Sequence, residues 1–202
     1  MKILLVGDSG TIGAAVADLL ASRGHTVVGA SRSHPERQVD ITDAASIDKL
    51  YADVGTVDAV VSAGGHVVYG SISEMSYDEY RASLCDKALG QIELVRRGLA
   101  AISPRGSFTL ITGVLLDRPV VTGSAAAAAN GAVEGFARAA ALELAPIRVN
   151  VVSPTLLTES VAKNGHLFPG ETPVSAELVA NAYLRSIETV ETGQIYRLHS
   201  AP

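Results

Sequence analysis

The chain alternates short apolar runs with longer segments in which apolar residues recur every three or four positions. The short runs predict strands at residues 2–6, 25–30, 57–63, 108–112, 147–152 and 194–198. The longer segments predict helices that begin at residue 14 and after residue 42, and others over residues 76–99, 124–144 and 175–187. Strands this apolar are buried on both faces, since polar residues would alternate along them if one face met water. The sequence therefore predicts an α/β fold, a doubly wound parallel sheet with helices on both faces.

The elements follow one another without a linker, a shift in composition or an internal repeat. We therefore expect a single domain over residues 1–202. The segment Asp40-Ile41-Thr42 opens the second helix, and Thr42 is its expected cap. The stretch from Pro154 to Ser175 is short for a substrate lid, although Phe168-Pro169-Gly170 is suited to a small flap. A short lid predicts an open site or a small substrate.

Composition narrows the class of protein. The chain is 48% apolar and 18% charged, as globular domains are, and its net charge of -5 with no basic cluster argues against nucleic acid as a partner. It has one cysteine, Cys85, which fits a reducing compartment, and Met1-Lys2 leads directly into a strand rather than a signal peptide. No run is long enough to span a membrane, and the five histidines lack metal-ligand spacing. We expect a cytoplasmic protein without a metal.

The first strand runs into the glycine turn Gly7-Asp8-Ser9-Gly10-Thr11-Ile12-Gly13, which a helix follows. Strand, glycine turn and helix together form the arrangement that binds a dinucleotide pyrophosphate. The glycines allow close backbone approach, and the free N–H groups of the helix face the phosphates. A glycine turn alone is weak evidence, because many such turns are glycine-rich for steric reasons. Its position between a strand and a helix favours nucleotide binding.

The end of the second strand predicts which dinucleotide binds. An acidic residue there would accept a hydrogen bond from the ribose 2′-hydroxyl, whereas an arginine accommodates a 2′-phosphate. The chain has Ser31-Arg32-Ser33 at this point and no acid. An arginine between two hydroxyls suits a phosphate, although a solvated loop arginine is the alternative. The sequence predicts NADP(H) rather than NAD(H).

Several segments, in order, resemble the short-chain dehydrogenase/reductase family over residues 2–198. They are the glycine turn, Ser31-Arg32, Asp40-Ile41-Thr42, Ser62-Ala63-Gly64, the helix containing Asn130-Gly131-Ala132, and Ile147-Arg148-Val149-Asn150-Val151-Val152-Ser153-Pro154 with Thr158 after it. The resemblance implies a Rossmann fold and a nicotinamide cofactor. With the glycine turn it predicts cofactor contacts from Gly7, Ser9, Gly10, Thr11, Ile12, Gly13, Ser31, Arg32, Ser33, Asp40, Ile41, Ala63, Gly64, Thr112, Asn130, Pro154 and Thr158.

The catalytic positions of that family do not match. Family members use a tyrosine as proton donor, a lysine four residues later, a serine on the preceding strand end and an asparagine on the fourth helix. At the position of the family's tyrosine this chain has Ala126, and at the position of the lysine it has Asn130. The position of the family's serine falls at or next to Gly113, beside Thr112. At the position of the family's asparagine this chain has Lys87. Because alanine donates no proton, the usual route to carbonyl reduction is closed.

Three polar residues are candidate replacements: Lys87, Asn130 and Tyr69. Tyr69, like His66, follows the third predicted strand and so lies at the carboxyl end of the sheet, where ligands bind. Each residue also has a purely structural interpretation. Tyr69 would then be a packed tyrosine, His66 an ordinary loop histidine and Lys87 a solvated helix lysine. Lys87 could hydrogen-bond Asn130 or the ribose, or act as the acid once desolvation lowers its pKa. We hypothesise that Lys87 and Asn130 together form a polar floor under the nicotinamide ribose.

Three functions stay open at this stage. The first is an NADP(H)-dependent oxidoreductase that acts on a small substrate by a non-standard mechanism, with an iminium or activated alkene as suitable acceptors. The second is a non-catalytic NADP(H)-binding sensor or assembly subunit, and the third is a structural domain without cofactor. Family members usually associate through their fourth and fifth helices. The resemblance therefore implies a homodimer or homotetramer through helices 76–99 and 124–144, where small residues allow close packing.

Overall fold

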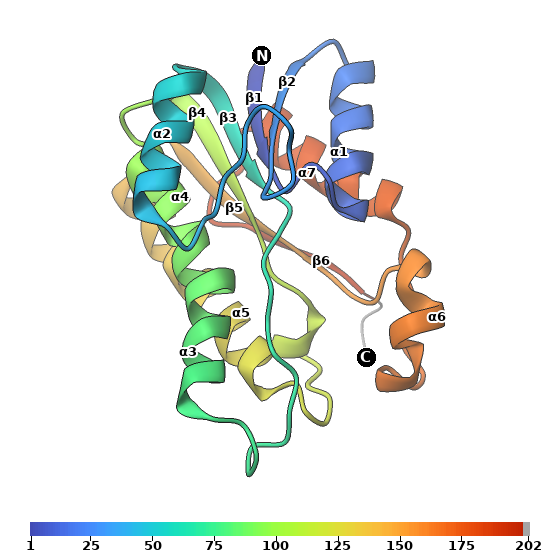
Figure 1. Cartoon of the computed structure of the whole chain (residues 1–202). Helices are drawn as coiled ribbons and strands as arrows, with labels where there is room; N and C mark the ends of the chain where they lie inside the picture. Colours follow the sequence, from blue (N-terminus) through green and yellow to red (C-terminus); the bar gives the residue numbers. More distant parts are fainter. Residues whose placement is uncertain (200–202) are drawn as a thin grey trace.

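A computed structural model describes residues 1–199, and their strands form one six-stranded sheet (Figure 1). All strand pairs are parallel, in the order β2-β1-β3-β4-β5-β6. The strands are β1 (Lys2–Val6), β2 (Thr26–Ala30), β3 (Val57–Ser62), β4 (Ile102–Ile111), β5 (Arg148–Pro154) and β6 (Ile195–Leu198). Each lies where the sequence predicts a strand, although β4 begins six residues earlier than its apolar run at Phe108.

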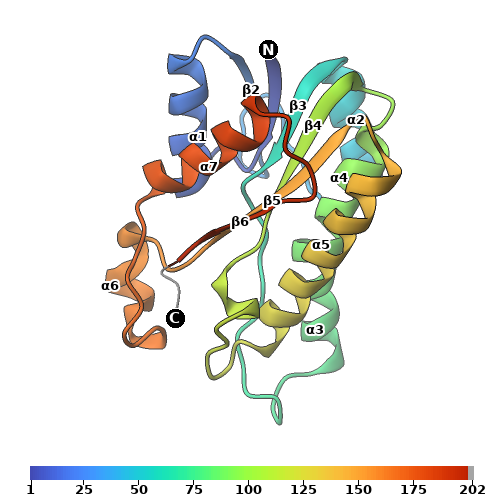
Figure 2. The same cartoon turned by 180° about the vertical axis from the view of Figure 1, so that it is seen from behind.

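Helices cover both faces of the sheet, as predicted (Figures 1 and 2). Their bounds are α1 (Thr11–Ser22), α2 (Ala44–Val54), α3 (Tyr77–Leu84), α4 (Gly90–Gly98), α5 (Ser124–Glu143), α6 (Val161–Asn164) and α7 (Ala176–Glu188). Alternate residues of β1 supply the two cores. Leu4 packs in a cluster with α2, α4 and α5, whereas Ile3 and Leu5 pack in a second cluster with α1 and α7. Within the described residues, none of the helices is long and apolar enough to cross a membrane.

The helix predicted over residues 76–99 is correct at its start and interrupted in its middle. Ser76 and Glu79 form a capping box, in which each side chain accepts from the other residue's backbone N–H. A π-helical turn, Cys85–Leu89, then separates α3 from α4. A π turn adds a residue to the helical ladder and often marks a functional site. It therefore changes the direction of the residues that follow without breaking the helix.

The fully buried Gln91 stabilises this π turn against the sheet. Its Nε2 donates to the carbonyl oxygens of Lys87 at 2.7 Å and Ile111 at 2.9 Å. Its Oε1 accepts from the Ile111 N–H at 2.8 Å. These three hydrogen bonds join the turn to the end of β4. They pair backbone groups of the irregular helix and of the strand end with one buried side chain.

The predicted cap of the second helix is wrong by one residue. Asp43 caps α2, because its side chain accepts from the Ala45 N–H. Thr42 lies one residue before the cap position, and both its N–H and its hydroxyl donate to Oδ1 of Asp40. This Asp40 turn orients the chain into the helix and leaves the capping to Asp43.

The segment between β5 and α7 is more ordered than a simple flap. It contains two 3₁₀ turns (Thr158–Ser160 and Gly165–Leu167) on either side of α6. An isolated bridge between Leu157 and Val174 closes its base. The segment lies at the carboxyl end of β5, where Figure 2 shows α6 set apart from the sheet.

Candidate active site

A cleft follows the carboxyl ends of the strands and consists of two adjoining cavities. The smaller has a volume of about 290 Å³ and lies at the ends of β1, β2 and β3. The larger has a volume of about 560 Å³ and lies at the ends of β4 and β5. Both are lined by Ala63, Gly64 and Gly65, which follow β3. One extended ligand can therefore cross from one cavity to the other, as ligands of doubly wound sheets do.

The glycine turn forms one side of the smaller cavity, and its glycines are sterically required. Gly7 has a φ of 94°, which other residues rarely adopt. A Cβ on Gly13 would lie 2.1 Å from the Gly7 oxygen, and a Cβ on Gly7 would lie 3.0 Å from the Gly64 nitrogen. The turn leads into the amino end of α1, whose first N–H groups have no partner within the helix. This is a phosphate-binding geometry.

The smaller cavity brings together most of the predicted adenosine-side residues. Its lining includes Gly7, Ser9, Gly10, Ser31, Arg32, Ser33, Ile41, Ala63 and Gly64. Two hydroxyls in its wall, those of Ser31 and Ser62, are buried and have no hydrogen-bond partner within residues 1–199. Buried hydroxyls are normally paired, so these two are available to hydrogen-bond a polar ligand. Together with the glycine turn, they fit the nucleotide half of a dinucleotide.

Arg32 lies at the mouth of the smaller cavity and is 65% exposed along its side chain. Its Nη1 is 3.5 Å from Oδ2 of Asp86, which comes from the π turn. Beside it, the Ser33 hydroxyl donates to Oγ of Ser9 at 3.3 Å. The guanidinium and these two hydroxyls thus form a cationic, hydrogen-bonding rim beside the glycine turn.

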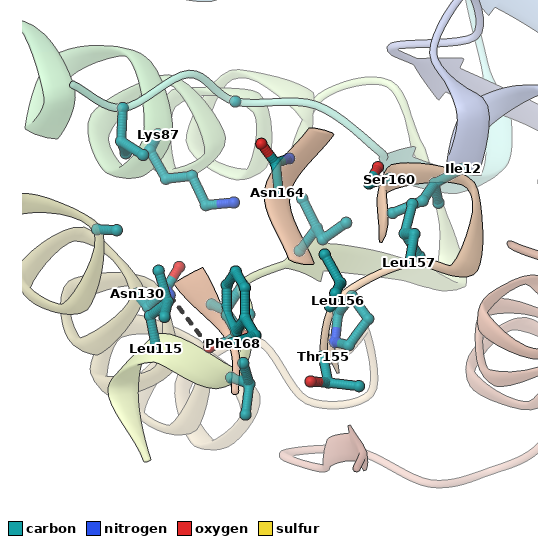
Figure 3. A pocket seen from close by; sticks show the side chains of 18 of the residues that line it. Ile12, Lys87, Leu115, Asn130, Thr155, Leu156, Leu157, Ser160, Asn164 and Phe168 are labelled. Carbon is teal, nitrogen blue, oxygen red and sulfur yellow. Dashed lines mark hydrogen bonds between the residues drawn. The ribbon is translucent and has the colours of Figure 1, made fainter. Parts of the chain in front are cut away.

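The larger cavity has apolar walls and a few polar groups (Figure 3). The apolar side includes a small cluster of Val114, Leu115 and Ala126, against which Phe168 packs. The polar side chains in the lining are those of Tyr69, Lys87, Thr112, Asn130, Thr155, Ser160 and Asn164. Within the described residues, Lys87 is the one cationic group in this lining, and no carboxylate shares it.

Lys87 extends into the larger cavity from the π turn (Figure 3). Its stem packs on Gly65, where an added Cβ would lie 2.9 Å from the lysine Cδ. Burial lowers the pKa of the Lys87 amine to about 8, and the neighbouring charge of Asp86 partly opposes this shift. Tyr69 faces the same space, and burial raises the pKa of its phenol. Near neutral pH the site therefore holds an ammonium that loses its proton readily beside a neutral phenol.

Asn130 reaches the same cavity from α5, but it does not bond Lys87. Its Nδ2 donates to the carbonyl oxygen of Gly113 at 3.1 Å, and no hydrogen bond to Lys87 occurs in the described part of the chain (Figure 3). Among residues 1–199 nothing donates to its buried Oδ1, which is therefore available to accept a hydrogen bond from a ligand. Ala126 lines the cavity one helical turn earlier. The polar floor thus consists of two separate groups rather than a bonded pair.

The other predicted contacts are divided between the cavities and their surroundings. Ile12, Thr112 and Pro154 line the larger cavity, and Gly13 is buried under the turn. Thr11 faces a groove between α1 and α7 instead. Asp40 and Thr158 are exposed and line neither cavity. The carboxylate of Asp40 instead accepts a hydrogen bond from the Thr42 N–H. The imidazole of His66 is exposed as well.

Sequence reasoning missed three polar residues around the cleft: Asp86, Gln91 and Glu134. Gln91 and Glu134 are fully buried polar residues on otherwise apolar helix faces. A polar residue within an apolar helical stripe is the sequence signal that could have indicated them. Glu134 accepts from the Thr112 hydroxyl at 3.3 Å and pairs with Arg197 of β6. It therefore links the end of β4 to the last strand. Asp86 gives no signal beyond its position next to Lys87.

Known proteins share this fold over nearly the whole chain. A family model described as enoyl-(acyl carrier protein) reductase matches residues 6–196. A curated relative, 3-ketodihydrosphingosine reductase of Bacteroides thetaiotaomicron, is 24% identical over 94% of this chain and 75% of its own length. The solved structure of the protein lin1944 from Listeria innocua is 43% identical, with a TM-score of 0.95 over 98% of both chains. A small-chain dehydrogenase solved in complex with NADPH is 27% identical, with a TM-score of 0.87 over 98% of this chain and 96% of its own. The chain belongs to the short-chain dehydrogenase/reductase family.

Proposed function

We propose that this protein is an NADP(H)-dependent oxidoreductase that transfers a hydride to or from a small substrate, with Lys87 in place of the usual tyrosine as proton donor. The observation that carries the proposal is the position of Lys87. Its amine lies in an apolar cavity that adjoins the glycine turn, and its pKa is lowered to about 8. A general acid works best when its pKa is near the working pH.

The cleft can hold the cofactor along its length. The glycine turn would hold the pyrophosphate, while Arg32 and Ser33 would hold a 2′-phosphate at the mouth of the smaller cavity. The NADPH complex of a structurally similar dehydrogenase supports this choice of nucleotide. When bound, NADP(H) supplies or accepts the hydride. Of the predicted contacts, Asp40 and Thr158 would need to approach the cofactor from outside the present cavities.

In this arrangement the chain's own residues orient the substrate and handle the proton. The Lys87 ammonium donates a proton to the oxygen or nitrogen that gains charge during reduction. The unpaired Oδ1 of Asn130 accepts a hydrogen bond from a hydroxyl of the ligand. The apolar walls exclude water, which strengthens the electrostatic effect of a nearby ammonium. Reduction of an iminium or an activated alkene depends least on proton donation, and reduction of a carbonyl depends on it most.

Turnover of NADPH with matched carbonyl, imine and activated-alkene compounds tests the proposal. Lys87→Met should lower the turnover number by about 10²- to 10⁴-fold, as loss of a positioned general acid does. Lys49→Met is the matched control, since Lys49 is an exposed lysine on α2 that lines neither cavity of the cleft, and its loss should leave turnover unchanged. Equal turnover by the Lys87→Met protein would contradict the role of Lys87.

A non-catalytic NADP(H)-binding role is the second candidate, and one observation favours it. Ala126 places no proton donor where the family's tyrosine would stand, and it contributes only apolar surface to the cavity. NADPH binding with no turnover of any of the three substrate classes would support this sensor role over the enzyme.

We also propose that the single domain associates as a homodimer or homotetramer through helices 76–99 and 124–144. Exposed apolar side chains on these helices, Leu89 and Leu142 among them, support this arrangement. The free thiol of Cys85 is consistent with work in a reducing compartment such as the cytoplasm. Sedimentation of the wild-type and Leu142→Glu proteins tests the assembly, because a charge on the interface should shift it toward monomer.

A further inference from the structure

We propose that Asp86 is a positioning residue that couples the adenosine end of the cleft to Lys87. It holds Arg32 when the cleft is empty, and it acts on Lys87 alone once Arg32 turns to the 2′-phosphate of a bound cofactor. This inference rests on the proposed function, because it takes Arg32 as the 2′-phosphate ligand and Lys87 as the proton donor.

The π turn makes this coupling physically direct. Asp86 and Lys87 are consecutive residues of the turn Cys85–Leu89, and they face different cavities. Asp86 lines the smaller cavity with Arg32, whereas Lys87 lines the larger cavity with Asn130. A single peptide unit therefore joins the two halves of the cleft, and Gln91 anchors the following peptide, through the Lys87 carbonyl, to the end of β4.

The carboxylate of Asp86 has two partners of different strength. Its Oδ1 accepts from the backbone N–H of His66 at 2.8 Å, which orients the carboxylate between the cavities. Its Oδ2 is 3.5 Å from Arg32, and the Arg32 side chain is 65% exposed. An exposed, long ion pair is weak, so Arg32 can leave it for a doubly charged phosphate at little cost.

Few other charges act on Lys87. On its own helix the neighbour is Asp86, and the loop after β3 contributes Tyr69, whose pKa burial raises, and the exposed imidazole of His66. Among described residues of α5 and of the segment between β5 and α7, none that lines this cavity carries a charge. Asp86 is thus the anion through which a change at Arg32 can reach the Lys87 amine.

The direction of the effect follows from the charges. With Arg32 beside it, the negative charge of Asp86 is partly neutralised and favours the Lys87 ammonium less. When Arg32 moves to a phosphate, the whole charge of Asp86 acts on Lys87 and raises its pKa. Lys87 would then carry its proton more fully when NADP(H) is in the cleft. The 2′-phosphate of the cofactor thus favours the protonated form of the proton donor, Lys87.

The test is an NMR titration of the full-length protein labelled with ¹³C-lysine, read at the ε-carbon of Lys87. The chain has four lysines, and Lys87→Arg assigns the signal by its loss. The probe is 2′,5′-ADP, which carries the 2′-phosphate but has no nicotinamide to reach Lys87. The matched probe is 5′-AMP, which lacks that phosphate. Calorimetry verifies that each nucleotide is bound at the concentration used.

We expect 2′,5′-ADP to raise the titration midpoint of Lys87 by about half a unit to one unit, and 5′-AMP to leave it unchanged. In Asp86→Asn the midpoint should start lower and should not move with 2′,5′-ADP. The Asn oxygen can still accept from His66, which preserves the turn. Binding of 2′,5′-ADP without a shift, or the same shift in Asp86→Asn, would overturn the coupling alone. Failure of 2′,5′-ADP to bind would overturn both the coupling and the proposed NADP(H) preference.

Discussion

At the scale of single residues, the chemistry of the site depends on an amine in an unusual place. A lysine normally has a pKa near 10.5, and burial in the larger cavity lowers that of Lys87 to about 8. Desolvation penalises the ammonium, so it releases its proton more readily than a surface lysine does. Arginine at the same position would keep its charge at every accessible pH.

This shift predicts the pH dependence of reduction. Because the ammonium is the proton donor, kcat/KM for NADPH in the direction of reduction should be highest below pH 8 and fall as the pH rises through about 8, the pKa of Lys87 before the cofactor binds. Lys87→Arg should remove this fall, since arginine does not lose its proton there. The measurement is kcat/KM for NADPH against pH for both proteins, because this ratio reports the pKa of the protein without bound cofactor. A wild-type profile that stays flat through pH 8 would contradict the assignment.

Local residue chemistry was also what the sequence predicted best. The strand, glycine turn and helix placed Gly7 and Gly13 correctly, because few other arrangements require glycine at both positions. The sequence also indicated that Lys87, Tyr69 and Asn130 would share one region, and all three line the larger cavity. It could not show that Asn130 would bond Gly113 instead of Lys87, since that depends on distances of a few ångströms across the fold.

At the scale of elements, the π turn between α3 and α4 decides where the chemistry lies. It directs Asp86 to one cavity and Lys87 to the other. The sequence predicted one continuous helix here, because a single extra residue in the ladder hardly changes the apolar period over residues 76–99. The polar Gln91 in the buried stripe was the available signal, and only the structure shows what it binds.

Gln91→Leu should therefore destabilise the fold by about 2–3 kcal/mol, because it removes the buried side-chain partners of the Ile111 N–H and carbonyl groups. Denaturant unfolding measures the change. The matched control is Gln194→Leu, an exposed glutamine whose side chain reaches only the Thr192 carbonyl, and we expect a change below about 0.5 kcal/mol there. Equal effects of the two substitutions would show that Gln91 does not support the turn.

At the scale of the whole molecule, a buried ion pair joins the end of the sheet to the helix behind the site. Arg197 of β6 donates from Nη1 and Nη2 to the two carboxylate oxygens of Glu134, at 3.2 and 3.1 Å. The Glu134 side chain is 1% exposed and also accepts from Thr112, which lines the larger cavity. No sequence pattern relates residue 134 to residue 197, so this connection was beyond prediction although both elements were expected.

Removing one partner of this pair should be costly. In Arg197→Met, Glu134 stays buried without its main cation, and we expect about 3 kcal/mol of lost stability. Arg81→Met removes an exposed pair with Asp78 and should cost less than about 0.5 kcal/mol. Thermal and denaturant unfolding of both proteins would measure the contrast. A loss in Arg197→Met no larger than that in Arg81→Met would mean that the pair contributes little.

The proposed function of this protein requires NADP(H) to lie along the cleft between the glycine turn and Lys87. Calorimetric titration of the wild-type and Arg32→Ala proteins with NADPH and with NADH tests this most directly. We predict that wild-type protein binds NADPH about tenfold or more tightly than NADH, since a phosphate paired with arginine is a strong interaction. We also predict that Arg32→Ala weakens NADPH binding to the level of NADH while leaving NADH binding unchanged. Equal affinity of the wild-type protein for both nucleotides, or no binding of either, would contradict the account.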